Sequence, residues 1–382
     1  MPDRTLPTPG RDRTRPMRAV QVERCGRPPV VAGRPAPSPA PGQVAVRVIA
    51  APITPLDLLC ATGTSYFGAP AVPYVPGVQG VGTVADRTVW FPTAAGMAPG
   101  DGSMAELALA RTEDLIDLPP GTDPFAMAAL GLSAVAAHMA LTWRGELRAG
   151  EQVLVLGGGG VVGQAAIQLA RLSGARRVVA AARSPEGLDR AEQAGADAVV
   201  PLTGPGTAAT GSPDAPKPHP PEAAAPSNPN VAAPDRLGSA ERSSPRVAAD
   251  GGPDVAELAA RLAAACDGPV DLVLDPLFGI PAAAAARTLR NGGRLVNLGG
   301  SASETCPLDS ATLRSRSLRL LGYTNNELTR EQRAASIAFI AAQSAAGRLS
   351  VAHEVVPLED AAAAWQRQAS GTTTGRIVLR IT

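Results

Sequence analysis

A run of glycines constrains the fold of this 382-residue chain more than any other feature. Gly158, Gly160 and Gly163 stand in the spacing G-x-G-x-x-G. An apolar β-branched run at 152–156 precedes them, and apolar residues at helical spacing follow them. In a strand, turn and helix of this kind, the first glycine permits the turn, the second lets the backbone approach a pyrophosphate, and the third lets the helix pack on the strand. We therefore expect a dinucleotide site at this helix N-terminus.

The sequence around these glycines shows two patterns of secondary structure. Apolar runs at 152–156, 177–182 and 270–275 alternate with amphipathic segments, which is typical of a parallel sheet with helices on both faces. Before residue 123, short runs between glycines and prolines predict a β-rich unit of partly open barrel type. The strand, helix and strand at the C-terminal end are too few to stand alone, and we expect them to complete that unit.

Two segments lack the composition of a packed fold. Residues 1–16 are rich in Arg and Pro and have no apolar signal core, and residues 203–253 are rich in Pro, Ala, Ser and Gly. We expect a disordered tail and a disordered insertion in a surface loop. Met17 opens a clean strand and is an alternative natural start.

Composition and charge exclude several classes of partner. A net charge of +1 and an aromatic content of 3% argue against nucleic acid and anionic membranes. We find no run of about eighteen apolar residues and expect no membrane-spanning helix. The four cysteines are far apart and form no C-x-x-C pair, which favours a reduced, cytoplasmic protein.

Several further motifs occur in a characteristic order. They are P-x-x-P-G-x-x-G-x-G-x-V from Pro73, G-L-S-A-V at 131–135, the glycine turn, P-L-E-D-A-A-A-A-W from Pro357 and G-R-I-V-L from Gly375. This order resembles the medium-chain dehydrogenase/reductase superfamily on its zinc-free, quinone oxidoreductase-like side. The resemblance runs from residue 17 to the end, apart from the insertion. It implies an α/β protein with a Rossmann doubly wound parallel sheet at 124–323 and a β-rich GroES-like catalytic domain at 17–123 and 324–382.

The positions at which zinc-dependent members of that superfamily carry ligands hold other residues here. Thr54 in T-P-L-D stands where those members begin C-G-x-D, and Val78 and Gln79 stand where they carry G-H-E. Neither valine nor glutamine is a serviceable zinc ligand. His138 and His353 are explained more simply as partly buried or surface histidines. We therefore expect no metal.

The residues after the second strand of the parallel sheet point to the cofactor. An NAD site carries an acid there, whereas this chain has Ala182, followed by Arg183 and Ser184. A guanidinium and a hydroxyl suit a 2′-phosphate, so we expect NADPH. The alternative is that Arg183 is an ordinary exposed charge at a strand end.

The resemblance implies more cofactor contacts, although each of these residues could equally serve a turn or packing. They are Val161, Val162, Ser133, Leu298, Gly299, Gly300 and Arg376.

The resemblance also implies the reduction of a quinone or of a C=C bond conjugated to a carbonyl, in which hydride addition is followed by protonation. Tyr66 is the candidate proton donor, near where related enoyl reductases place a tyrosine; Tyr74, Tyr323 and water are the alternatives. Thr54 is a second candidate catalytic residue, because relatives often carry an Asn there. Trp90, Phe91 and Met104 are candidates for an apolar substrate pocket.

Three functions remain open. The chain is expected to be an NADPH-dependent reductase of quinones or enones, a tailoring enoyl reductase of secondary metabolism with one narrow substrate, or a redox-silent NADPH-binding relative. The segment Ser317–Tyr323 would be the last strand of the parallel sheet. Relatives pair such an edge with its copy, so we expect a homodimer.

Overall fold

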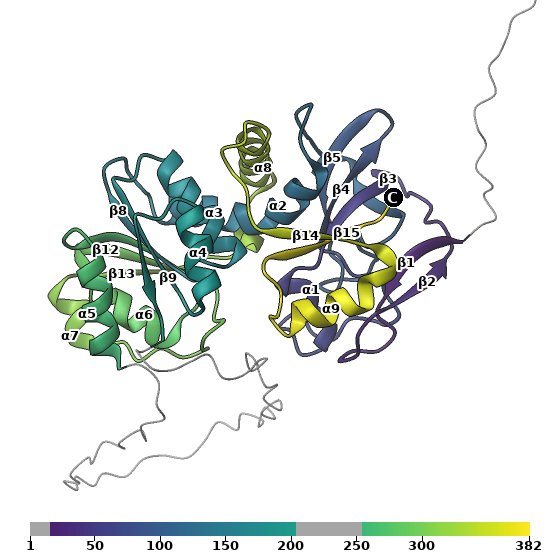
Figure 1. Ribbon diagram of the computed structural model, residues 1–382. Coiled ribbons are helices and arrows are strands. Elements are labelled where there is room, and N and C mark those ends of the chain that lie inside the picture. Colours follow the sequence, from purple (N-terminus) through teal and green to yellow (C-terminus); the bar gives the residue numbers. More distant parts are fainter. Residues whose placement is uncertain (1–15, 204–253) are drawn as a thin grey trace, which may run out of the picture.

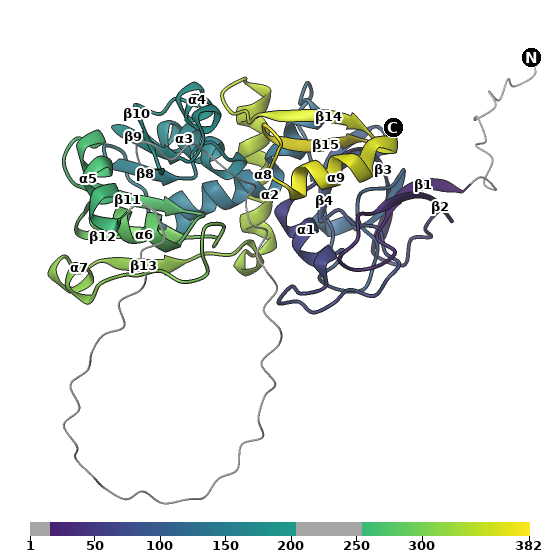
Figure 2. The same ribbon diagram turned by 60° about the horizontal axis from the view of Figure 1, so that its bottom comes forward.

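The computed structural model describes residues 16–203 and 254–382. These residues form two lobes, each built on its own large sheet, and the helices α2 and α8 lie between the lobes (Figures 1 and 2). The predicted tail at 1–16 and the predicted insertion at 203–253 lie outside the described residues, except for Pro16 and Thr203.

Six parallel strands form the sheet of the first lobe, in the spatial order β10-β9-β8-β11-β12-β13. Numbered along the chain, this is the order 3-2-1-4-5-6 of doubly wound dinucleotide-binding sheets. The order reverses between β8 and β11, and ligands bind at the carboxyl ends of the strands at such a point. The strands are β8 (Gln152–Leu156), β9 (Arg177–Ala182), β10 (Ala198–Pro201), β11 (Val270–Asp275), β12 (Leu289–Asn297) and β13 (Arg319–Gly322).

Helices cover both faces of this sheet because side chains alternate along its strands. On β8, Val153 and Val155 face the core under α2 and α3, whereas Leu154 and Leu156 face the core under α5 and α6. The helices of this lobe are α3 (Val161–Leu172), α4 (Pro185–Gln193), α5 (Val255–Ala265), α6 (Gly279–Ala286) and α7 (Ser310–Ser315).

The second lobe is β-rich. Its seven-stranded sheet has the order β14-β15-β3-β4-β5-β7, with β6 also paired to β3, and β1 pairs with β2 beside it. The C-terminal strand β15 pairs with β3, so the end of the chain completes the N-terminal sheet as expected. The strands are β1 (Met17–Gln21), β2 (Val30–Arg34), β3 (Gln43–Pro52), β4 (Gln79–Val84), β5 (Arg87–Pro92), β6 (Leu107–Arg111), β7 (Ile116–Asp117), β14 (His353–Pro357) and β15 (Arg376–Arg380).

The remaining helices are α1 and α9 of the second lobe and α2 and α8 between the lobes. Short helical turns at 112–114, 325–327 and 358–360 accompany them. The helices span α1 (Pro55–Thr62), α2 (Pro124–Met139), α8 (Arg330–Ala345) and α9 (Ala361–Ala369). The predicted class, a doubly wound parallel sheet with a β-rich GroES-like domain, is confirmed. The domain boundaries at 123/124 and 323/324 stay predictions.

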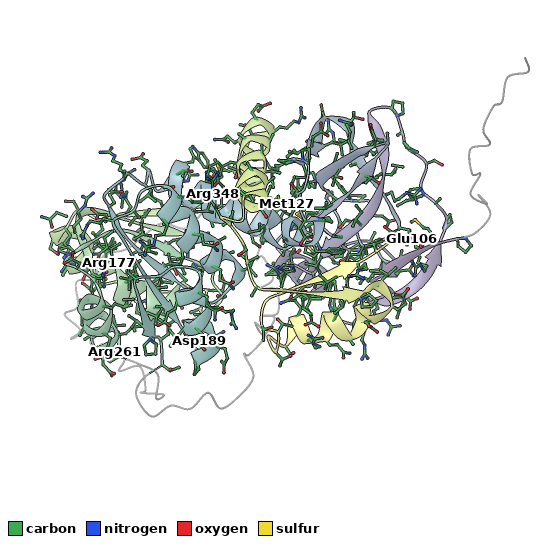
Figure 3. All side chains as sticks on the ribbon, turned by 45° about the horizontal axis from the view of Figure 1, so that its top comes forward. Glu106, Met127, Arg177, Asp189, Arg261 and Arg348 are labelled. Carbon is green, nitrogen blue, oxygen red and sulfur yellow. The ribbon has the colours of Figure 1, made fainter. Side chains whose placement is uncertain are left out.

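The apolar helix α2 continues through a π-helical turn to Arg144. By length and composition, Pro124–Arg144 could cross a membrane, with a mean hydropathy of 1.6, which corrects the expectation that the chain holds no such run. However, 61% of this window is buried inside the protein, and Met127 lies between the lobes with no exposed surface (Figure 3). Burial in the core accounts for the apolar composition of this helix.

The helix α2 is kinked at Gly131, and the buried amide side chain of Gln79 accepts hydrogen bonds at this kink. Gly131 has φ 28° and ψ −130°, and Gln79 Oε1 accepts hydrogen bonds from Leu132 N (2.8 Å) and Trp90 Nε1 (3.1 Å). A Cβ at Gly131 would lie 2.0 Å from Gln79 Oε1, so only glycine fits. One side chain of β4 thereby joins β5 to the helix between the lobes.

The substitution Gln79→Leu should destabilise the protein, because it leaves two buried N–H donors without an acceptor. Each orphaned donor costs about 1–3 kcal/mol. Urea denaturation of Gln79→Leu and of Gln366→Leu, at an exposed position of α9, measures the difference. Equal free energies of unfolding for the two variants would contradict the role assigned to Gln79.

Candidate active site

The turn between β8 and α3 is tightly packed on one side and open on the other. A Cβ at Gly163 would lie 2.2 Å from Gly157 O, and one at Gly158 would lie 2.7 Å from Ala180 Cβ. Gly160 is exposed, and its nearest contact, Gly157 O, would lie at 3.4 Å. Packing therefore requires the first and third glycines, whereas Gly160 leaves room for a ligand to approach the backbone.

The first turn of α3 supplies free donors beside that opening. Gly160 is the N-cap residue and gives the helix no side-chain cap. Val161 and Val162 follow it and are partly buried, and the first N–H groups of a helix have no intrahelical acceptor. The donors and the helix dipole fit the pyrophosphate of a dinucleotide.

The second strand, β9, ends as the sequence predicts. Ala182 is buried and Arg183 is exposed. The Ser184 Oγ accepts a hydrogen bond from Gly187 N (3.1 Å) and caps α4. Therefore Arg183 is free of the core, whereas the Ser184 hydroxyl already has a structural role.

A second arginine near the turn was missed by sequence reasoning. Arg190 of α4 donates from Nε to Gly159 O (3.0 Å). Its helix packs closely there, because a Cβ at Gly159 would lie 2.4 Å from Gly187 Cα. The motif spacing gives no signal for this residue, since the contact arises only when α4 folds back over the turn.

A buried polar pair holds the strand ends next to the turn. The Asp275 Oδ1 accepts from Leu277 N (2.9 Å) and Phe278 N (2.8 Å), and its Oδ2 accepts from Asn297 Nδ2 (3.0 Å). The same Asn297 amide donates to Gly299 O (2.9 Å). Burial raises the pKa of Asp275, and these donors oppose the shift. The pair fixes the loops after β11 and β12.

A cavity of about 480 Å³ lies where these loops meet the second lobe. Tyr66 lines it from the loop after α1, and the loop after β12 lines it with Leu298, Gly299 and Gly300. Residues after β13 (323–326) complete much of the wall. The structure thus brings four of the predicted site residues together at one cavity, while their roles stay predictions.

Two further predicted contacts, Arg376 and Ser133, meet inside the protein. Arg376 is 4% exposed and donates to Ile53 O (2.9 Å) and Ser133 Oγ (3.0 Å). Burial lowers the pKa of Arg376 to about 10, against the opposing charge of Asp57. A guanidinium buried in this way joins β15 to α2, so the predicted direct cofactor contact of Arg376 is not available in this structure.

Thr54 is placed as a structural residue, which corrects its prediction as a catalytic one. It is 5% exposed and is the N-cap of α1, with Oγ1 donating to Asp57 Oδ2 (2.6 Å). The Asp57 Oδ1 accepts from Gly77 N (3.0 Å) and Val78 N (2.9 Å). Burial raises the pKa of Asp57, and these hydrogen bonds oppose it. The Thr54 hydroxyl is committed to the cap.

The two alternative tyrosines differ. Tyr74 is 4% exposed and its hydroxyl has no hydrogen-bond partner, so it lies in the core and cannot serve the cavity. Tyr323 lines the cavity, and its hydroxyl donates to Asn325 Oδ1 (2.7 Å). Burial raises the pKa of both phenols.

The predicted apolar pocket of Trp90, Phe91 and Met104 is wrong. All three side chains have no exposed surface. Trp90 packs in the core shared with α2, and the other two pack in the core of the β-rich lobe. A side chain enclosed by the core cannot contact a substrate.

The residues at the positions of the zinc ligands do not fit a metal. Val78 has no donor atom, and the Gln79 Oε1 already accepts two hydrogen bonds. No group of three His, Cys, Asp or Glu side chains suited to a metal occurs within 16–203 and 254–382. His138 Nδ1 lies 2.9 Å from Ser336 Oγ, and His353 Nδ1 lies 3.0 Å from Val351 O.

Comparison with known proteins agrees with this architecture. Two models of the family described as zinc-binding dehydrogenase match residues 161–209 and 248–379. The quinone oxidoreductase of Rattus norvegicus is 34% identical to this chain over 198 residues, and that of Homo sapiens is 34% identical over 195 residues. Each match covers 48% of this chain and 58% of the relative. An alcohol dehydrogenase of Rhizobium meliloti is 34% identical over 217 residues, with 48% and 63% covered. The chain thus matches less than two thirds of the length of these relatives.

Solved structures extend the likeness to the whole fold. The quinone oxidoreductase from Thermus thermophilus, also solved in complex with NADPH, superimposes with a TM-score of 0.71 at 27% identity, covering 96% of this chain and 100% of that one. An NAD-dependent alcohol dehydrogenase has a TM-score of 0.73 at 24% identity, with 96% and 100% covered, and shows the fold alone. The fold and the glycine turn therefore define a two-lobed protein with a dinucleotide-binding sheet. The matched family models, the relatives and the Thermus thermophilus structure together support a quinone oxidoreductase-like protein of the medium-chain dehydrogenase/reductase superfamily.

Two glycine substitutions should separate packing from ligand binding at the turn. Gly163→Ala forces a Cβ against Gly157 O and should lower the free energy of unfolding by about 1–3 kcal/mol. Gly160→Ala meets only ordinary contacts and should leave stability nearly unchanged. It should weaken dinucleotide binding by about ten- to hundredfold, because a charge-assisted hydrogen bond is worth about 1.5–3 kcal/mol.

Thermal melting and fluorescence titration with NADPH measure both effects. Unchanged NADPH affinity in Gly160→Ala would show that the exposed backbone of the turn does not contact the dinucleotide.

Proposed function

We propose that the protein is a zinc-independent, NADPH-dependent reductase that transfers hydride to a quinone or an α,β-unsaturated carbonyl. One observation carries this proposal: the cavity of about 480 Å³ joins Tyr66 of the β-rich lobe to the loops at the carboxyl ends of the parallel strands. A bound nicotinamide dinucleotide would supply the hydride there. The relatives named as quinone oxidoreductases support the same reaction class.

The residues around the glycine turn support the choice of NADPH. Gly160 leaves the backbone accessible to a pyrophosphate, and the α3 N-terminus favours its negative charge. Ala182 removes the acid that would repel a 2′-phosphate, and the exposed Arg183 follows it directly. Arg190 adds a second positive charge near the turn.

Zinc independence rests on the chemistry of the donors. Thr54 caps α1, Val78 is apolar, and the Gln79 amide supports the break in α2. Catalytic zinc needs three protein ligands from Cys, His or carboxylate, which these positions do not supply. The reaction would therefore proceed without a Lewis acid on the substrate oxygen.

Tyr66 is the proton donor in this proposal. Its side chain is 75% exposed and lines the cavity, where a substrate anion formed by hydride addition would need a proton. Phe67 stands beside it, with the ring centroids 4.2 Å apart. Water reaching the open cavity is the alternative donor.

A substrate screen separates this function from its two alternatives. Steady-state NADPH consumption with generic quinones and enones supports a broad reductase. Turnover of one particular enone alone supports a secondary-metabolism enzyme with a narrow substrate. NADPH binding with no turnover supports a redox-silent relative.

Oligomer and location are proposed on separate grounds. The strand β13 lies at the edge of the parallel sheet, and Leu320 on it is 42% exposed, so we propose a homodimer paired along this edge. Light scattering tests this, and a monomeric mass at micromolar concentration would contradict it. We also propose a cytoplasmic location, since the four cysteines are free thiols. Expression of a tagged chain followed by cell fractionation tests that.

Arg183→Ala should remove the preference for NADPH over NADH. The guanidinium would lose its interaction with the 2′-phosphate, so NADPH affinity should fall by about tenfold or more, whereas NADH affinity should hardly change. Fluorescence titration with each dinucleotide measures this, and Arg24→Ala in the β-rich lobe is the matched control. If the unsubstituted protein binds NADPH and NADH equally, the assignment of Arg183 is wrong.

Tyr66→Phe should slow reduction without weakening NADPH binding. Loss of a positioned proton donor lowers kcat by about 10²-fold, while the retained ring keeps the cavity wall. The expected result is a fall in kcat at an unchanged dissociation constant for NADPH. An unaltered kcat would assign the proton to water.

A further inference from the structure

Phe278 has a backbone conformation that side chains normally avoid. Its φ is 60° and its ψ is −160°, in a region populated almost only by glycine. Residues persist in such conformations where the surrounding structure over-determines them, and they cluster at ligand-binding sites. Contacts around Phe278 must therefore hold its backbone in this strained conformation.

The cause is a set of hydrogen bonds at Leu277 and Phe278 together with close packing at the residue that follows. The Asp275 Oδ1 accepts from the N–H groups of Leu277 (2.9 Å) and Phe278 (2.8 Å). The Leu277 carbonyl accepts from Ala302 N (2.8 Å). The next residue, Gly279, packs so closely that a Cβ there would lie 2.9 Å from Ser303 Cβ. Together these contacts force the chain through the strained conformation.

The consequence is an aromatic ring at the cavity. Phe278 is half-buried and lines the cavity of about 480 Å³ together with Tyr66 and Tyr323. Aromatic residues make up only 3% of the chain, yet three rings from three separate segments meet at this cavity. Aromatic rings pack favourably against flat conjugated rings.

We propose that Phe278 is a ligand-contacting residue whose strained backbone holds its ring against a planar conjugated ring bound in the cavity. The proposal rests on the proposed function, which supplies two such rings, the nicotinamide of the cofactor and the ring of a quinone substrate. Asp275 acts through Phe278 as a positioning residue.

The strain is tested by comparing alanine with glycine at the same position. Replacing alanine by glycine normally destabilises a protein, because glycine is freer in the unfolded chain. At a strained position the order reverses, so Phe278→Gly should melt at a higher temperature than Phe278→Ala. Ile280, an exposed residue of α6, provides the control pair, in which Ile280→Gly should melt below Ile280→Ala. A Phe278→Gly variant that melts at or below Phe278→Ala would overturn the proposal.

Ligand contact is tested on the same four variants. Loss of the ring in Phe278→Ala and Phe278→Gly should weaken binding by about three- to tenfold, the size of an aromatic contact, and the Ile280 variants should match the unsubstituted protein. A higher dissociation constant for NADPH identifies the nicotinamide as the partner ring, and a higher KM for 1,4-naphthoquinone alone identifies the substrate ring. If neither constant changes, the proposal is overturned.

The design separates this proposal from the proposed function. If the unsubstituted protein binds NADPH but reduces no quinone, the proposed reductase activity fails, while NADPH titration and melting still test Phe278. In that case an unchanged dissociation constant for NADPH in both Phe278 variants overturns the proposal, and a raised one supports it.

Discussion

The contact between α3 and the turn after β8 is the constraint on which the dinucleotide-binding lobe depends. At Gly163 there is no room for a Cβ beside Gly157 O, which would lie 2.2 Å away. Because helix and strand meet at this distance, the free N-terminus of α3 lies at the edge where the strand order reverses between β8 and β11. The loops held by Asp275 gather at the same edge. The location of the site thus follows from one steric contact and the parallel topology.

The β-rich lobe is held beside this edge by buried polar groups whose hydrogen bonds are made within the protein. Gln79 accepts from Leu132 N and Arg376 donates to Ser133, both in α2. Asp57 fixes the lobe internally, because it accepts from the backbone of Gly77 and Val78. These residues include the positions that align by motif with the metal-binding segments of zinc-dependent members. An oxygen already occupied by N–H donors has little to offer a cation, so the structural use of these positions and a metal site exclude one another.

The glycine turn could be predicted because three independent signals agreed: glycine spacing, a β-branched run and helical periodicity. The strand at Gln152–Leu156 and the end of β9 at Ala182 lie where those signals placed them. The direction of individual side chains could not be predicted in the same way. Alternation on β5 places Trp90 and Phe91 on opposite faces, but nothing local distinguishes a cavity from a core. Phe278 gave no signal, since its backbone conformation is set by Asp275 together with contacts to Ala302 and Ser303 of a later loop.

Buried polar groups away from the cavity have their hydrogen bonds made, whereas a strained backbone conformation occurs at the cavity. Asp57 accepts hydrogen bonds from the backbone N–H groups of Thr54 and Val78, and Gln79 accepts one from the Trp90 indole. These hydrogen bonds stabilise the β-rich lobe. At the cavity, Phe278 holds a conformation that its own stability disfavours, because Asp275 imposes it. A glycine in place of Phe278 would remove both the backbone strain and the aromatic ring. The ring packs partly against the core of the parallel sheet, and its place at the cavity adds the proposed contact with a bound ligand at a site where a local backbone rule is broken.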